Sequence, residues 1–263
     1  MFSLLLFIAH LLSVEPNDTI SVVKPGDGTV SGRNIPAYKN SWEMTAVNLD
    51  GSVTYRGIWN DEISFVLRNG NEVLRREQHV YYNDKEAIQL DEVDRQTLMP
   101  IYINIRSVGQ DPHTEIHYDG KKIFGKKIFN IEGLDTLQKL SAPFSYELPE
   151  PVFDWHLWGV LISGFPLEQG YRARFLAHES YSYLPGDFRW FTLRVTGQEI
   201  IDGGKWGHVN CWTVEVKAEV VWRLWISVRK DIAPVQQIRI DDASGVQYWW
   251  KPRSSSSVPG VER

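Results

Sequence analysis

Apolar and polar residues alternate along most of the chain, and this period of two predicts β-strands. In one segment Ile63, Phe65 and Leu67 lie on one face, while Glu62 and Ser64 lie on the other. Segments with the same period lie at residues 101–105, 116–118, 191–195, 212–216, 222–228 and 238–240. The pattern predicts roughly nine or ten strands, each with one apolar and one polar face.

Short turns between these segments predict that neighbouring strands run antiparallel. Asn69-Gly70 accepts the positive φ angles of a type I′ hairpin turn, and Asp119-Gly120 predicts another turn further along the chain. Because an antiparallel sheet with one apolar face buries that face, we expect something packed against it.

One short stretch, "FDWHLWGVLISGFP", breaks the alternation and predicts a helix near residues 154–163. Asp154 is a typical N-cap residue, since its carboxylate accepts backbone N–H bonds at the positive end of a helix. Trp155, Trp158 and Ile162 fall on one helical face, and a glycine and a proline end the helix. We expect the helix to place its tryptophans in the concave face of a curved sheet.

The first residues carry an apolar run, Phe2–Leu12, that is too short to cross a bilayer, which takes about 20 residues. Such a run is typical of the core of a signal peptide, so we expect a signal peptide over residues 1–14 and export of the chain. No Lys or Arg precedes the run and no A-x-A cleavage site follows it. A buried N-terminal strand and a misassigned start are therefore the alternatives.

Polar segments rich in Gly, Pro or Ser flank the predicted strands. Residues 15–36 predict a linker or loose lead-in, and residues 251–263 predict a disordered tail. The length and apolar content of the chain suit one large β domain or two modest ones, and we predict a single curved-sheet β domain over residues 37–250.

Composition and charge narrow the function classes. The net charge of -5 and the pI near 5.8 give no reason to expect the basic face that nucleic-acid binding needs. The single cysteine, Cys211, rules out an intrachain disulfide, and its place on a strand face opposite Trp212 predicts a small half-buried residue. The 11 Trp, 11 Tyr and 11 Phe supply apolar surface for a core or for the walls of a cavity.

Several residue pairs that resemble metal sites have simpler explanations. His113 and His117 would share a metal on a helix, but on a strand they lie about 13 Å apart. A run of acidic residues lacks the spacing and the glycine of a calcium loop, and we interpret it as a solvated turn. This run comprises Asp84, Asp91, Glu92 and Asp94. We therefore expect no metal and no other cofactor.

Catalytic residues are not expected either. Asp154 and His156 occupy helix positions whose side chains point apart, and capping already explains Asp154. No nucleophile elbow, zinc-protease helix or phosphate-binding loop occurs in the sequence. His178 and Glu179 begin a loop-like segment, "AHESYSYLPGDF", which we interpret as a lid over the mouth of the sheet without an evident mechanism.

Seven phrases occur in an order that resembles one protein family. They are "YRGIWNDEIS", "EVDRQTLMP", "HYDGKKI", "PVFDWHLWGVLISGFPL", "GYRARF", "FTLRVTGQE" and "CWTVEVK". Over roughly residues 40–240 the chain is similar to exported bacterial proteins that are grouped as domain of unknown function 3108. The resemblance implies a large curved antiparallel sheet, a half-open barrel like the periplasmic lipoprotein carriers LolA and LolB, and a location in the periplasm or cell envelope. The family has no established catalytic residues, so the resemblance implies none.

These observations favour a non-enzymatic envelope protein that binds a lipid, or the acyl chain of a lipoprotein, in the concave face of the sheet. The expected walls of this cavity are Trp155, Trp158, Ile162, Trp212, Trp222 and Phe191. One alternative is a structural or partner-binding scaffold of the envelope whose core is filled. A second alternative is an envelope hydrolase with a site in its loops. A sealed core argues for the scaffold, and a cavity with a convergent histidine and carboxylate argues for the enzyme.

Overall fold

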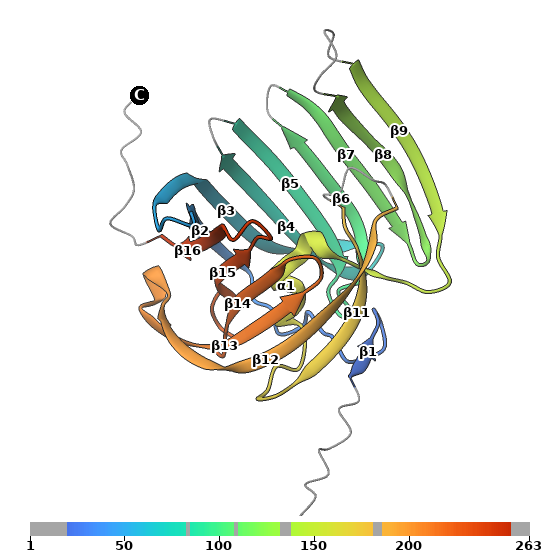
Figure 1. The fold of residues 1–263 in the computed structure, drawn as a ribbon. Helices are drawn as coiled ribbons and strands as arrows, with labels where there is room; N and C mark the ends of the chain where they lie inside the picture. The colour runs from blue at the N-terminus through green and yellow to red at the C-terminus, as the bar shows by residue number, and fades with distance from the viewer. Residues whose placement is uncertain (1–19, 83–84, 108–109, 132–137, 181–185, 254–263) are drawn as a thin grey trace, which may run out of the picture.

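A computed structural model of the chain describes residues 20–82, 85–107, 110–131, 138–180 and 186–253 (Figure 1). The expected signal peptide, the end of the expected tail from residue 254 and Asp84 lie outside the described residues. Among the helices of the described ranges, none is both long enough and apolar enough to span a membrane.

Strands dominate the fold, as the alternation predicted. The strands are β1 (Ser21–Val23), β2 (Tyr38–Val47), β3 (Val53–Arg68), β4 (Asn71–Tyr82), β5 (Lys85–Asp94), β6 (Pro100–Ser107), β7 (Gln110–Asp119), β8 (Lys122–Ile131), β9 (Gln138–Glu147), β10 (Phe153–Asp154), β11 (Arg172–His178), β12 (Phe188–Asp202), β13 (His208–Lys217), β14 (Val221–Ser227), β15 (Val235–Asp241) and β16 (Gln247–Pro252). They form one 16-stranded sheet in the order β1-β11-β12-β13-β14-β15-β16-β2-β3-β4-β5-β6-β7-β8-β9, and β10 also pairs with β11. The two pairings of β11 with β1 and β10 are parallel, and the rest are antiparallel.

Hairpins form where the turn residues predicted them. Asn69 and Gly70 both have positive φ, 51° and 81°, and the flanking Arg68 and Asn71 are paired across β3 and β4. The structure has more strands than we predicted, because some strands are too short to show alternation. β10, for example, consists of Phe153 and Asp154 alone, and both are buried.

The sheet is open, which corrects the expectation of a half-open barrel. Its outermost strands, β1 and β9, are not hydrogen-bonded to each other, and the sheet is neither closed nor strongly curled. Alternation decides which face of each strand is buried. It does not decide how far the sheet bends, which depends on twist accumulated over all the strands.

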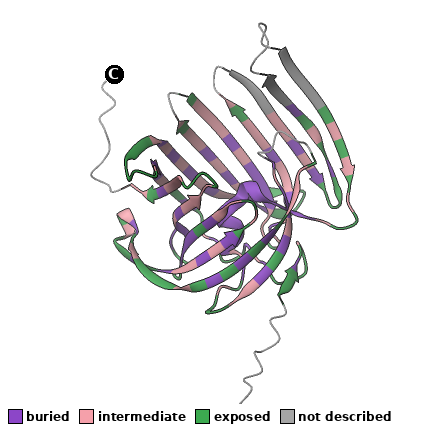
Figure 2. Ribbon diagram, in the orientation of Figure 1, coloured by how far each residue is buried: buried purple, intermediate pink, exposed green. Residues whose placement is uncertain are grey.

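The predicted helix is present and short. Asp154 caps a 3₁₀ turn, η1 (Trp155–Leu157), which leads into the α-helix α1 (Trp158–Ser163) and ends at Gly164. Every residue of η1 and α1 is buried, and α1 contacts β14 and β15 (Figure 2). A helix that is apolar on all sides is stable only inside a core, and here the core lies between α1 and the sheet.

The lead-in before the domain packs against the rest of the chain, unlike the loose segment that we expected. Val23, Val30 and Ile35 are only 2–3% exposed, and the Ser31 N–H donates to the Gly164 carbonyl at 3.0 Å. Glycines make the segment irregular, so these apolar residues show no period. Their burial depends on neighbours that are distant in the sequence.

Strands from opposite ends of the strand order meet through side chains. Ile103, Ile116 and Ile123 of β6, β7 and β8 form an apolar cluster against which Leu176 of β11 and Phe188 of β12 pack. We call this contact the seam.

A smaller apolar cluster contains Cys211, which is fully buried, whereas we predicted a half-buried residue. Burial raises the pKa of its thiol to about 12.

Candidate functional site

The residues that we predicted to line a cavity form an aromatic core around η1 and α1. The Trp155 ring stacks on Phe191 with 4.3 Å between centroids and meets Trp222 edge to face at 5.3 Å. Trp158 meets Trp222 at 4.8 Å, and Ile162 is fully buried. The sixth predicted residue, Trp212 of β13, is half-buried and packs against this core. The structure thus brings the six residues together.

Little space remains among these rings. A cavity of about 10 Å³ lies between Trp158 and three tryptophans of β2, β3 and β16, namely Trp42, Trp59 and Trp250. This is roughly the smallest volume that holds one water molecule. In this structure, therefore, the protein's own side chains fill this part of the core.

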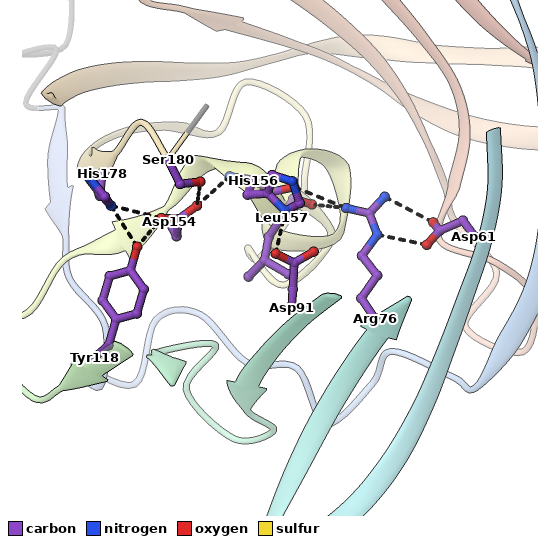
Figure 3. Close-up of polar contacts among 9 residues, drawn as sticks. All are labelled: Asp61, Arg76, Asp91, Tyr118, Asp154, His156, Leu157, His178 and Ser180. Carbon is purple, nitrogen blue, oxygen red and sulfur yellow. Dashed lines mark hydrogen bonds and ion pairs between the residues drawn. The ribbon is translucent and has the colours of Figure 1, made fainter. Parts of the chain in front are cut away.

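A buried polar network, which the sequence analysis missed, lies between η1 and the sheet (Figure 3). We use this name for Asp61, Arg76, Asp91, Tyr118, Asp154, His156, His178 and Ser180. All eight residues are at most 8% exposed. Since a buried polar group without partners is strongly destabilising, the bonds within the network decide whether this region is stable.

Asp154 is the centre of one half of the network. Its carboxylate accepts hydrogen bonds from the His156 N–H and the Ser180 hydroxyl, both at 2.7 Å, and from the Tyr118 hydroxyl. The Nδ1 atom of His178 lies 3.2 Å from Asp154 and 2.7 Å from the Tyr118 oxygen. Burial favours a higher pKa for Asp154, but His178 and Tyr118 outweigh burial and lower the pKa. The carboxylate is therefore held in its charged form.

Arg76 is the centre of the other half. Its guanidinium binds Asp61 of β3 through two hydrogen bonds, at 2.9 and 3.0 Å, and donates to the Leu157 carbonyl at 3.1 Å. Close by, the His156 side chain contacts the Asp91 carboxylate of β5. Through these contacts β3, β4 and β5 hold the first helical turn in place.

Two predictions about polar residues are decided by this geometry. We predicted that the side chains of Asp154 and His156 point apart, and they do. The Asp154 carboxylate contacts Tyr118, and the His156 ring contacts Asp91. The interpretation of Asp91 and Glu92 as part of a solvated turn is wrong. Both lie in β5 and are fully buried, and Glu92 accepts from Arg68 at 2.8 Å.

One signal in the sequence marks the buried network. Asp61 stands between Trp59 and Ile63, at a position where alternation calls for an apolar residue. Arg76 likewise follows Leu74 on the buried face of β4. A polar residue at a position that alternation assigns to the apolar face of a strand predicts a buried hydrogen-bond partner, although the sequence does not say which residue this partner is.

The histidines of β7 agree with the strand prediction. His113 and His117 lie within the strand Gln110–Asp119, and the His117 ring stacks on Phe124 with 5.3 Å between centroids. The His113 side chain is outside the described part of the chain. Over the described residues, no group of three or more His, Cys, Asp or Glu residues is arranged to hold a metal ion.

An apolar cavity of about 290 Å³ lies beside the seam, and we call it the seam pocket. Its walls are Val22, Val23, Lys24, Pro25, Leu148, Pro149, Glu150, Pro151, Val152, Leu176 and Trp190. Nine of these eleven residues are apolar, and the other two, Lys24 and Glu150, pair with each other at 2.5 Å.

Pairing of the strands at this edge of the sheet explains how the pocket forms. Leu176 of β11 lies opposite Trp190 of β12, and β1 pairs in parallel with the other side of β11. Val152 and Leu148 enter the pocket from the connection between β9 and β10, and both belong to the seam cluster. Trp190 is 45% exposed. One wall of the pocket therefore faces solvent.

Comparison with known proteins gives one match. The model of a family described as "Protein of unknown function (DUF3108)" matches residues 52–246. No curated protein and no solved structure matches the chain.

Proposed function

The chain belongs to the DUF3108 family, whose model covers most of its length, and we propose that it binds an apolar chain, such as the acyl chain of a lipid or lipoprotein, in the seam pocket. One observation carries the proposal. The pocket has a volume of about 290 Å³, and nine of the eleven residues around it are apolar.

Water in such a pocket meets mostly carbon atoms. An apolar ligand that replaces it gains roughly 25 cal/mol for each Å² of apolar surface removed from water. Ligand pockets typically measure about 300–1,000 Å³, so this one is at the lower end and suits a single chain or part of one. Exposed apolar side chains such as Val22 and Trp190, which are 50% and 45% exposed, would also be covered.

This proposal places the ligand away from the aromatic core. The rings of Trp155, Trp158 and Trp222 contact one another, and a chain bound there would have to displace them. The seam pocket needs no such rearrangement, because its space is already present.

A scaffold of the cell envelope that binds a partner protein is the second candidate, and the filled aromatic core favours it. His178 and Asp154 converge as an enzyme's residues would, but both are fully buried and their bonds hold η1. We assign them a structural role. Export to a bacterial periplasm or envelope stays a prediction from the apolar run at residues 2–12.

Titration with a fluorescent fatty acid tests the proposed function. We expect saturable binding to the native chain and binding at least about fivefold weaker in Trp190→Ala, which loses one apolar wall. The exposed Ile200, which is 69% exposed and not part of the pocket, provides the matched control Ile200→Ala, which should bind as the native chain does.

Trp158→Ala separates the two locations for the ligand. If the ligand occupies the seam pocket, this variant binds normally as long as it is folded, which thermal unfolding checks. Binding that changes in Trp158→Ala and not in Trp190→Ala would place the ligand in the aromatic core. No binding by the native chain would leave the scaffold as the better explanation.

A further inference from the structure

We infer that the ligand of the seam pocket is a single-chain fatty acid whose carboxylate is bound at the mouth of the pocket by Lys24 and Arg174. This inference rests on the proposed function and adds the chemistry of the ligand's polar end. It comes from the position of these two cations beside an otherwise apolar cavity.

Lys24 follows β1 directly and is part of the pocket wall. Its Nζ atom lies 2.5 Å from the Glu150 carboxylate, and the two side chains are 48% and 54% exposed. An ion pair this exposed contributes little to stability, because water solvates both charges well when they separate. A ligand carboxylate can therefore replace Glu150 beside Lys24 at small cost.

Arg174 approaches the pocket from β11. It is paired with Val22 of β1, a pocket residue, and its guanidinium carbon lies 4.4 Å from the centroid of the Trp190 ring. Stacking on an indole uses the face of a guanidinium, whereas its N–H donors lie at the edge and match the two oxygens of a carboxylate. Trp190 thus joins the apolar wall to this cation.

Two acidic residues, Asp27 and Glu150, lie near Lys24, and they do not compete equally with a ligand carboxylate for its ammonium group. The Asp27 carboxylate accepts hydrogen bonds from the backbone N–H groups of Lys24 and Thr29, both at 2.8 Å, which directs it into its own turn. Glu150 is the acid that contacts the Lys24 ammonium. Removing the charge of Glu150 should therefore strengthen the binding of an anionic ligand.

Calorimetric titration of the full chain with dodecanoate and with dodecanol tests this inference, because the two probes share a chain and differ in charge. The native chain should bind dodecanoate about two- to fivefold more tightly than dodecanol, as expected for a partly exposed charge pair. Lys24→Met should remove this preference by weakening dodecanoate binding, so that the variant binds the two probes about equally. Glu150→Gln should increase the preference for dodecanoate over dodecanol about threefold.

The ion pair of Lys39 and Glu62, at 2.8 Å, provides matched controls away from the pocket. Lys39→Met and Glu62→Gln should bind both probes as the native chain does. Equal binding of dodecanoate and dodecanol by the native chain, unchanged in Lys24→Met, would overturn the inference and leave the proposed function standing. Binding of neither probe would instead contradict the proposed function itself.

Discussion

At the scale of single residues, the environment of Asp154 shows how one side chain comes to serve two purposes. As an N-cap alone it would stabilise the chain by about 1 kcal/mol. Its carboxylate, which is itself fully buried, also accepts hydrogen bonds from Ser180 and Tyr118. Removing one partner of such a buried charged group costs about 3–5 kcal/mol, so the network outweighs the cap.

Glu179, next to this network, is a half-buried carboxyl whose charge is disfavoured. Burial, with a further contribution from Asp154, raises its pKa from 4.5 to about 7. Between these two values the folded chain binds more protons than the unfolded chain. Stability is therefore highest at acidic pH within this range and falls as the pH rises through 7.

Glu179→Gln tests this pH dependence, because glutamine keeps the shape and does not ionise. Between pH 4.5 and pH 8 the free energy of unfolding of the native chain should fall by about 2–3 kcal/mol relative to the variant. Urea unfolding at several pH values measures the difference. Glu168→Gln, at an exposed position, should give a curve parallel to that of the native chain. If the curve for Glu179→Gln is also parallel to that of the native chain, burial does not raise the pKa of this carboxyl.

At the scale of elements, α1 exists because of its packing. A helix of six residues is far too short to be stable alone, since isolated helices below about 12–15 residues are marginal in water. Gly159 lets the helix approach the sheet closely. A Cβ atom at this position would lie 2.5 Å from a methyl carbon of Val235 in β15 and 3.2 Å from one of Leu224 in β14.

Gly159→Ala should therefore destabilise the chain, although alanine favours helices by about 1 kcal/mol over glycine. We expect the free energy of unfolding to fall by about 1–3 kcal/mol, as is usual for overpacked cores. In a double-mutant cycle, Val235→Ala should recover part of this loss, and the coupling should be at least about 0.5 kcal/mol. Gly197→Ala is the control, because the nearest atom to its new Cβ, Thr213 Oγ1, is 3.6 Å away. Additive effects of Gly159→Ala and Val235→Ala would contradict this account of the helix contact.

At the scale of the whole molecule, residues 30–35 join parts that are far apart in the sequence. Ser31 bonds to Gly164 at the end of α1, and Arg33 donates to Gln96, beyond the end of β5, at 2.9 Å. Val30 and Ile35 are buried in the same cluster as the helix tryptophans. The lead-in is thus part of the core and holds the helix end against the sheet.

Ile35→Ala measures how much this lead-in contributes. The side chain is 2% exposed, and its truncation should lower the free energy of unfolding by about 2–5 kcal/mol. Ile200→Ala removes the same atoms at a position that is 69% exposed and should change the stability by less than about 0.5 kcal/mol. An equally small effect of Ile35→Ala in urea unfolding would restore the interpretation of a loose lead-in.

Features that depend on neighbouring residues were predictable from the sequence. The period of two identified the strands around Ile63, the Asn69-Gly70 pair identified a hairpin, and Asp154 identified the start of the helix. Each of these rests on the geometry of a few consecutive residues, which their own side chains decide.

The candidate sites depend on residues that only the tertiary structure brings together. His178 meets Asp154 because β10 pairs with β11, and Trp190 meets Val22 in one pocket because β1 pairs with β11 on its other side. Alternation says that a strand has a buried face but not which strand lies next to it. The sequence by itself therefore determined a β protein with one capped helix. The order of its strands, the bend of its sheet and the seam pocket arise from long-range pairing, and only the tertiary structure decided them.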